Sequence, residues 1–328
     1  MRRAGIIGLC IASGIIVSVI AFVVWNRSGP RFESFTFSPD GKYIAAVYSN
    51  SDSSFIYKIP LATGLASRFT KATEGFEGTP SFSPDGKQLA YSYWPKGKKT
   101  HSYIVIMNPD GLSSFRWPPS DADDFSPVFS SNKSIIFGRS GYYGSYSPIA
   151  QPHLHEWNFF VSDLDGTNVR QITNENFFMV SRVSVSTESN TMLFVSTEDH
   201  GDVMYIYSIE NPSSPRVVLK PNIEVEPGDP IYGDSIFMPG DESILFTAAT
   251  QGASSYYDYD IYKMNMHSQK IDKLTNSNGY AYGLQLSRDG KTAIFMRDVP
   301  HWYGDRTEVL LLDIKTHRLK PFIISGLQ

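Results

Sequence analysis

The chain has 328 residues, of which 41% are hydrophobic, 19% charged and 14% aromatic, enough for one large repeat domain or two small ones. The formal net charge is −4 and no basic stripe occurs, which argues against nucleic acid as a partner. Because Cys10 is the single cysteine, no disulfide or cysteine-based metal site is available within the chain.

The first 30 residues are expected to form a signal anchor and a short polar linker. Two arginines precede residues 4–25, a run of 22 residues without a charge, which as a helix spans about 33 Å and can cross a bilayer core. The arginines before the run and Trp25 at its end favour a single transmembrane helix whose N-terminus is cytoplasmic. The alternative is a cleaved signal peptide with a cleavage site at residues 19–21.

A repeated turn organises everything after the linker. Ser-Pro-Asp-Gly-Lys occurs at residues 38–42 and 83–87, and weaker copies follow to the end of the chain. Proline fixes φ at the second turn position, aspartate accepts a local backbone hydrogen bond, and glycine takes the left-handed conformation that closes a hairpin. The strands before these turns end at positions separated by 45, 47, 56, 52 and 49 residues, namely Phe37, Phe82, Phe129, Val185, Phe237 and Leu286.

The spacing predicts six units of four short strands. Each turn is followed by a continuous apolar strand, such as residues 44–47 or 244–246, and such strands are typically buried on both faces. Units of this kind pack side by side, and radial closure into a β-propeller leaves no long exposed edge. We therefore predict an all-β fold, with a six-bladed β-propeller of four-stranded blades over residues 31–328, preceded by one N-terminal transmembrane helix.

The repeat resembles the TolB-type β-propeller repeat. The resemblance lies in the Ser-Pro-Asp-Gly-Lys turn before an apolar strand, Asp-Leu-Asp-Gly at residues 163–166, and the Ile-Thr and Leu-Thr endings at residues 172–173 and 274–275. It covers nearly the whole chain after the linker, although the separate N-terminal domain of TolB itself has no counterpart. The resemblance implies a periplasmic binding role. Some propellers with such repeats resemble oligogalacturonate lyases, which implies a metal-dependent, carbohydrate-active enzyme as the alternative.

The candidate binding residues lie in long aromatic loops between the second and third strands. In an up-and-down blade these loops share one face with the connections between blades, whereas the Asp-Gly turns lie on the other face. Tyrosine and tryptophan are favoured at binding surfaces, although packing beneath the loops is the alternative. The residues expected to bind are Trp94, Tyr142, Tyr143, His153, His155, Trp157, Tyr256, Tyr257, His301, Trp302 and Tyr303.

Signatures of enzymes and metal sites are sparse. In an extended segment His153 and His155 point the same way, so a site completed by His101 or His301 is the metal-binding alternative. This spacing is no specific metal motif, and we expect neither a metal nor another cofactor. The acidic residues 121–124 are interpreted as a solvated loop, with calcium binding as the alternative.

No Gly-x-Ser-x-Gly or glycine-rich phosphate loop occurs, which excludes a prolyl-oligopeptidase-type hydrolase and gives no sign of a nucleotide site. The sequence therefore predicts a non-enzymatic propeller on the periplasmic or extracytoplasmic side of the cytoplasmic (inner) membrane. It is held there by a single-pass helix and binds a protein or a cell-envelope component through its aromatic loops.

Overall fold

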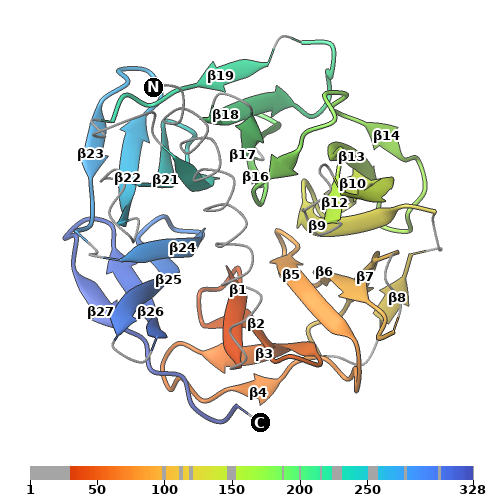
Figure 1. The fold of residues 1–328 in the computed structure, drawn as a ribbon, viewed down its shortest axis with the longest axis horizontal. Coiled ribbons are helices and arrows are strands. Elements are labelled where there is room, and N and C mark those ends of the chain that lie inside the picture. Colours follow the sequence, from red (N-terminus) through yellow and green to blue (C-terminus); the bar gives the residue numbers. More distant parts are fainter. Residues whose placement is uncertain are drawn as a thin grey trace, which may run out of the picture.

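The computed structural model describes residues 30–97, 101–110, 114–117, 121–145, 153–186, 188–198, 201–214, 216–223, 231–249, 258–276, 279–301 and 304–327. Within these residues the structure consists of β-strands without a helix, and the sheets stand side by side around a central axis (Figure 1). The all-β prediction is confirmed. The predicted membrane helix at residues 4–25 lies outside the described residues, and none of the described segments is a helix able to span a bilayer.

The first eight strands form one hydrogen-bonded sheet that consists of two four-stranded halves. The first half contains β1 (Arg31–Phe37), β2 (Tyr43–Ser49), β3 (Ser54–Pro60) and β4 (Ser67–Arg68). The second half contains β5 (Phe76–Phe82), β6 (Leu89–Trp94), β7 (Tyr103–Met107) and β8 (Ser114–Arg116). Neighbours within each half are antiparallel, and one parallel pair, Ser54 with Phe76, links the halves.

The next strands form a four-stranded sheet with a two-stranded extension. The sheet contains β9 (Asp123–Phe129), β10 (Ser134–Ser140), β13 (Asn158–Asp163) and β14 (Arg170–Gln171). Between β10 and β13 the chain continues as a ribbon of β11 (Tyr142–Gly144) and β12 (His153–His155).

The remaining strands complete the circle. A five-stranded sheet contains β15 (Met179–Val180), β16 (Ser184–Ser186), β17 (Thr191–Glu198), β18 (Gly201–Ser208) and β19 (Val217–Leu219), and β15 and β16 both pair with β17. A four-stranded sheet follows with β20 (Tyr232–Phe237), β21 (Ser243–Ala249), β22 (Tyr259–Asn265) and β23 (Ile271–Lys273). The last sheet contains β24 (Tyr280–Leu286), β25 (Thr292–His301), β26 (Gly304–Asp313) and β27 (Leu319–Pro321).

The core lies between neighbouring sheets, which explains the continuous apolar strands. Every residue of β21 is buried, and Ile44 to Val47 in β2 have no exposed surface. On one side of β17, Leu193 shares a core cluster with Ile244 of β21. On the other side, Phe194 shares a cluster with Phe159 of β13, so β17 packs against sheets on both faces. Because both faces of these strands are buried, they lack the alternation of polar and apolar residues that is typical of a sheet with one exposed face.

The segment after β27 closes the ring by packing against the first sheet. We call residues 322–327 the C-terminal strap. The amide of Ala66 donates to the carbonyl of Ser325 (2.7 Å), and the amide of Ser325 donates to the carbonyl of Gly64 (3.0 Å). Phe322 is buried in the same core cluster as Phe35 of β1. The strap therefore joins the first and last sheets through backbone and apolar contacts.

The Ser-x-Asp-Gly-Lys turns share one hydrogen-bonding pattern. The Ser38 hydroxyl donates to Asp40 (2.7 Å), Asp40 accepts from the amide of Lys42 (3.1 Å), and the amide of Tyr43 donates to Ser38 Oγ (3.1 Å). The same three bonds recur in the turns at residues 83–88 and 287–292. The hydrogen bonds from Ser38 and Lys42 lower the pKa of Asp40.

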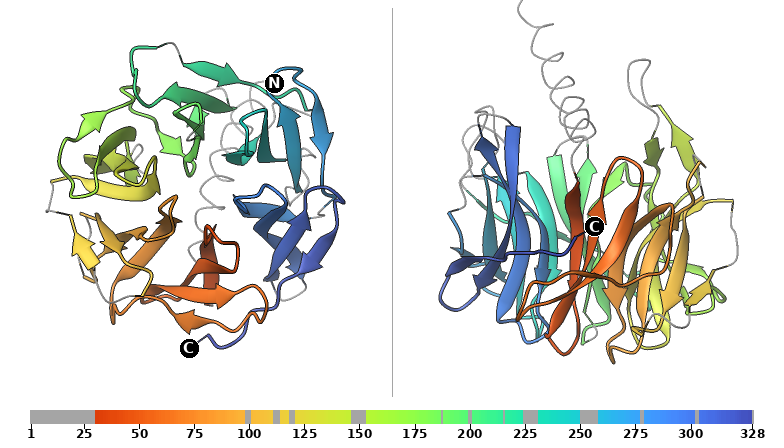
Figure 2. Two further views of the ribbon diagram at one scale, coloured as in Figure 1. Left: turned by 180° about the vertical axis from the view of Figure 1, so that it is seen from behind. Right: turned by 90° about the horizontal axis from the view of Figure 1, so that it is seen from below.

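These turns contact one another across the face that carries them, which we call the turn face. The amide of Asp85 donates to the Asn132 side chain (3.0 Å), and Arg288 donates to the carbonyl of Pro84 (2.5 Å). The repeated aspartates are thus occupied within their own turns, and the turns pack together. The opposite face, where the chain enters β1 and where β10 continues into the β11–β12 ribbon, is the loop face (Figure 2).

Candidate binding surface on the loop face

Aromatic side chains gather on the β11–β12 ribbon, which Figure 2 shows standing above the sheets. The ring of Tyr142 packs edge-on against His155 with centroids 4.4 Å apart, and His153 lies 5.3 Å from His155. Phe178, just before β15, lies 5.6 Å from His153 and 6.1 Å from His155. These ring contacts join Tyr142, His153, His155 and Phe178. We define the ribbon cluster as these four residues together with the exposed residues next to them in the chain, Tyr143 of β11 and Met179 of β15.

The ribbon cluster is apolar and exposed. Tyr142 and Tyr143 are each 45% exposed, and Met179 is 50% exposed. The Nε2 atom of His155 is buried and has no hydrogen-bond partner among the described residues, and the ring packs against Tyr142 and Phe178. Exposed apolar patches of this kind on a folded scaffold commonly mark interaction sites.

Sequence reasoning missed Phe178 and Met179 because they lie between two repeat units and not in a loop between second and third strands. The available signal was the run of four apolar residues at 177–180. Successive residues of an extended segment point to opposite sides, so such a run cannot be buried completely. Phe177 is 5% exposed and enters the core, whereas Phe178 is 39% exposed.

The other predicted binding residues have different environments. Trp94 ends β6 and is half-buried against Gly78 of β5. Trp157 is buried beside Phe125, with ring centroids 4.4 Å apart, and supports the ribbon from below instead of presenting a free ring. His301 ends β25, where only its backbone is described. The remaining four residues lie outside the described residues: Tyr256, Tyr257, Trp302 and Tyr303.

A charged group lies where the first strands of the sheets converge on the axis. Arg182, between β15 and β16, donates to the carbonyl of Phe35 in β1 (2.8 Å) and to the carbonyl of Pro80 in β5. Its side chain therefore reaches from its own sheet to both halves of the first sheet. Burial lowers the pKa of Arg182 to about 10, and the negative charge of Asp234 opposes that shift.

Asp234 in β20 is held by the neighbouring strand β24. The register of β24 shifts between Tyr282 and Gln285, and Gly283 adopts a left-handed φ of 69° there. This bulge turns the amide of Leu284 toward Asp234, which accepts its hydrogen bond at 3.0 Å. Burial raises the pKa of Asp234, while this bond and Arg182 act in the opposite direction.

Further carboxylates surround the same region. Burial, together with the charges of Asp234, Asp298 and Asp202, raises the pKa of Tyr280 to about 12. The Tyr280 ring packs against Tyr259 and Tyr282, with centroids 4.6 and 5.3 Å away, and the residue is 44% exposed. Arg182 and its carboxylate neighbours were not predicted, because only the folded ring brings them together.

The described residues give no support to a metal centre. No group of three His, Cys, Asp or Glu side chains among them could hold a metal ion. The interpretation of residues 121–124 as a solvated loop is wrong for Asp123 and Asp124, which are 3% and 4% exposed. Asp124 forms a two-bonded ion pair with Arg139 (2.6 and 2.8 Å), and Asp123 accepts from the amide of Ser102 (2.6 Å).

Sequence comparison relates one stretch of the chain to TolB. The Tol-Pal system protein TolB of Francisella tularensis subsp. mediasiatica is 35% identical over 86 residues, which are 26% of this chain and 19% of that protein. The corresponding protein of F. tularensis subsp. holarctica gives the same values. The chain thus matches about a fifth of the length of these curated relatives, and no family model matches it.

Structure comparison covers most of the chain. TolB from Acinetobacter baumannii superposes with a TM-score of 0.54 and 13% identity, covering 88% of this chain and 62% of that one. An oligogalacturonate lyase in complex with manganese gives a TM-score of 0.58 and 14% identity, covering 88% and 75% of the two chains. Identities this low establish the fold alone. Together with the matched stretch and the repeated turns, they make this chain a TolB-like β-propeller protein.

Proposed function

We propose that the chain is a membrane-anchored, extracytoplasmic propeller that binds a protein or another envelope component through its loop face. The matched relative is, by its name, a component of the Tol-Pal system, which supports a role as a binding protein of the envelope. We further propose six blades, each a four-stranded group. The two halves of the first sheet support this count, as do the four-stranded cores of the sheets that follow.

The ribbon cluster is the observation that carries the binding proposal. Four of its side chains project from the paired strands β11 and β12, which continue from a buried sheet, so hydrogen-bonded strands present them for binding. Tyrosine and methionine are enriched in the buried centres of protein interfaces, where a few residues supply most of the binding energy. The Ser-x-Asp-Gly-Lys turns of the turn face, by contrast, have their polar groups engaged with each other.

The point at which the chain enters the first sheet supports a fixed orientation of the propeller toward the membrane. β1 begins at Arg31 on the loop face, and only residues 26–30 separate it from the proposed anchor. Five extended residues reach at most about 18 Å. An anchor at residues 4–25 therefore turns the loop face toward the bilayer, and the partner is expected close to the membrane surface.

Photo-crosslinking in intact cells tests the proposed surface. A photoreactive amino acid placed at Tyr143 or Met179 of the full chain is expected to give a discrete crosslinked product. The same residue at Lys42 is the matched control, because that side chain is 80% exposed on the turn face. Equal products from all three positions, or none from Tyr143 and Met179, would contradict the proposal. Alkaline carbonate extraction of membranes tests the anchor separately, since an integral protein stays in the pellet.

A further inference from the structure

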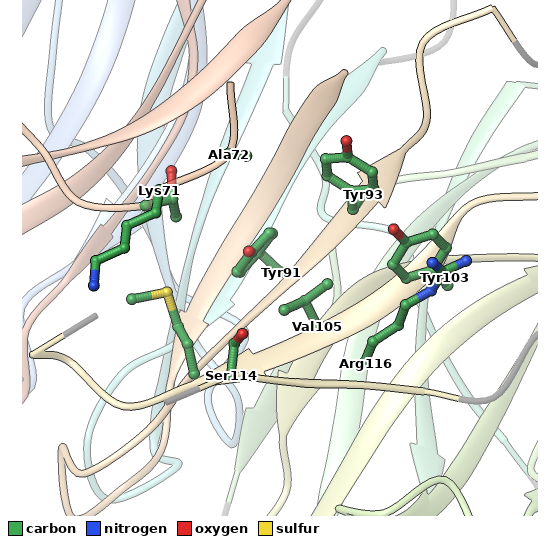
Figure 3. Close-up of a pocket in the computed structure, with 10 residues that line it drawn as sticks. Lys71, Ala72, Tyr91, Tyr93, Tyr103, Val105, Ser114 and Arg116 are labelled. Carbon is green, nitrogen blue, oxygen red and sulfur yellow. The ribbon is translucent and has the colours of Figure 1, made fainter. Parts of the chain in front are cut away.

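A second candidate binding site lies in the first sheet, away from the strands of the ribbon cluster. A cavity of about 360 Å³ opens between the residues that follow β4 and the strands β6, β7 and β8 (Figure 3). This volume is near the lower end of the range of small-molecule sites, about 300–1,000 Å³. The cavity therefore has room for a ligand about the size of a single sugar unit.

The cavity has an apolar base and an aromatic wall. Tyr91, Val105 and Met107 belong to the buried core cluster between the two halves of the sheet. Above them, the rings of Tyr93 and Tyr103 lie with centroids 5.3 Å apart. Such a wall offers aromatic surface to the C–H groups of a ligand, in the way that aromatic side chains line most small-molecule sites.

Two of the three tyrosine hydroxyls have no protein partner among the described residues. The Tyr93 hydroxyl donates to the carbonyl of Glu74 at 3.0 Å. The hydroxyls of Tyr91 and Tyr103 make no hydrogen bond to any described residue, although Tyr91 is only 6% exposed. Both tyrosines line the cavity, so these two hydroxyls are available to hydrogen-bond a ligand or ordered water there.

Two cations also line the cavity. Figure 3 shows Lys71 on one side of Tyr91 and Val105, and Arg116 on the other. The guanidinium of Arg116 lies over the Tyr103 ring, 3.6 Å from its centroid, which leaves its N–H edges free to donate. Neither cation forms an ion pair with a described residue, and no acidic side chain is among those that line the cavity.

We propose that this cavity binds a small, hydroxyl-rich organic anion, held by its ring on the tyrosines and by its carboxylate or phosphate at the flanking cations. A neutral apolar ligand would leave Lys71, Arg116 and the two tyrosine hydroxyls unpaired, whereas an inorganic anion would not use the aromatic wall. A uronic acid and a sugar phosphate both have the required chemistry. The inference concerns binding alone and is independent of the loop-face partner.

Calorimetric titration of the purified full chain in detergent tests the inference. Glucuronate and glucose 6-phosphate are the probes, and glucose and inorganic phosphate are the controls. At least one sugar anion is expected to bind saturably, and about tenfold more tightly than either control, because charge-assisted bonds and ring contacts each contribute. Binding by glucuronate alone identifies a carboxylate site, and binding by glucose 6-phosphate alone identifies a phosphate site.

Variants of the cations complete the test. Arg116→Gln and Lys71→Gln are each expected to weaken binding about tenfold, the effect of losing a charge-assisted hydrogen bond. Lys87→Gln is the matched control, because Lys87 is exposed on the turn face and pairs with Asp85. Denaturant unfolding of each variant checks that it is folded. The inference is overturned if neither probe binds up to about 10 mM, if glucose or inorganic phosphate binds as tightly as the sugar anions, or if both cation variants bind normally.

Discussion

Glu77 shows how a single polar residue can be fixed inside the stacked sheets. It lies in β5 and is 1% exposed. Its Oε2 atom accepts from the amide of Ile56 (2.8 Å) and from the Thr70 hydroxyl (2.6 Å), whereas Oε1 has no partner among the described residues. In other sheets a threonine accepts the equivalent amide directly, as Thr173 does from Phe159 (2.8 Å).

The position of Glu77 makes stability depend on pH. Burial raises the pKa of Glu77 from 4.5 to about 7. Between these values the native state holds a proton that the unfolded state has lost, so the free energy of unfolding falls as pH rises from about 4.5 to about 7. The full loss is about 3 kcal/mol, on the scale of 1.36 kcal/mol per pH unit. Urea denaturation across this range is the measurement.

Glu77→Gln provides the control for this prediction. The amide is neutral at every pH and retains an oxygen that can accept from Ile56. The variant is therefore expected to lose the Glu77 part of the pH dependence between about 4.5 and 7. If the variant and the original chain show the same slope, Glu77 does not bind a proton in the folded state over this range.

At the scale of elements, the repeated turns act both as hairpin closures and as packing surfaces. Gly41 and Gly290 hold the same turn position, with φ of 66° and 71°. A Cβ added at Gly41 would meet no atom within 4 Å, whereas a Cβ added at Gly290 would lie 2.9 Å from Pro239 of the preceding turn. The two sites therefore separate backbone strain from contact between turns.

Alanine at these two glycines is expected to have unequal effects. Gly41→Ala should destabilise the protein by about 1 kcal/mol, the cost of a left-handed conformation for an L-residue. Gly290→Ala should cost about 1–3 kcal/mol more, because Pro239 must also move. Thermal or denaturant unfolding gives the comparison, and equal losses at the two positions would show that the turns do not pack together in solution.

At the scale of the whole molecule, the C-terminal strap is the closure of the ring. Gly64 has φ of 66°, like Gly41, but a Cβ there would lie 2.1 Å from the carbonyl oxygen of Ile323 in the strap. Alanine at Gly64 and alanine at Gly41 therefore cause similar backbone strain, but only alanine at Gly64 displaces the strap.

Gly64→Ala is accordingly expected to destabilise the chain by at least about 2 kcal/mol more than Gly41→Ala. Limited proteolysis followed by mass spectrometry should also show faster cleavage near the C-terminus in Gly64→Ala alone. Equal stability and equal cleavage of the two variants would mean that the strap does not hold the ring closed.

Local chemistry makes much of the architecture predictable. The repeat predicts strands that end at Phe37, Phe82 and Phe129, and β1, β5 and β9 end there, because the turn that follows each strand is specified by adjacent residues. The loop-face residues Tyr142 and His155 can be proposed from sequence because long aromatic loops are visible in it.

Features that depend on distant residues cannot be predicted in this way. The acidic residues 121–124 resemble a solvated loop, because nothing nearby in the sequence shows that Arg139 on the next strand neutralises Asp124. Arg182 reaches carbonyl groups 147 and 102 residues away, at Phe35 and Pro80. Strand pairing brings Arg139 to Asp124, and closure of the ring brings Arg182 to its two carbonyl groups. No local sequence pattern encodes either arrangement.

The C-terminal strap also determines when the ring can close during synthesis of the chain. Ribosomes make the chain from its N-terminus, so the β3–β4 connection exists long before Ser325, which binds it, has been added. Until then the first sheet lacks the apolar cover that Phe322 and Leu327 provide. The ring can therefore close only after the strap itself has been synthesised, and a chain that lacks the strap leaves this seam open to chaperones and proteases.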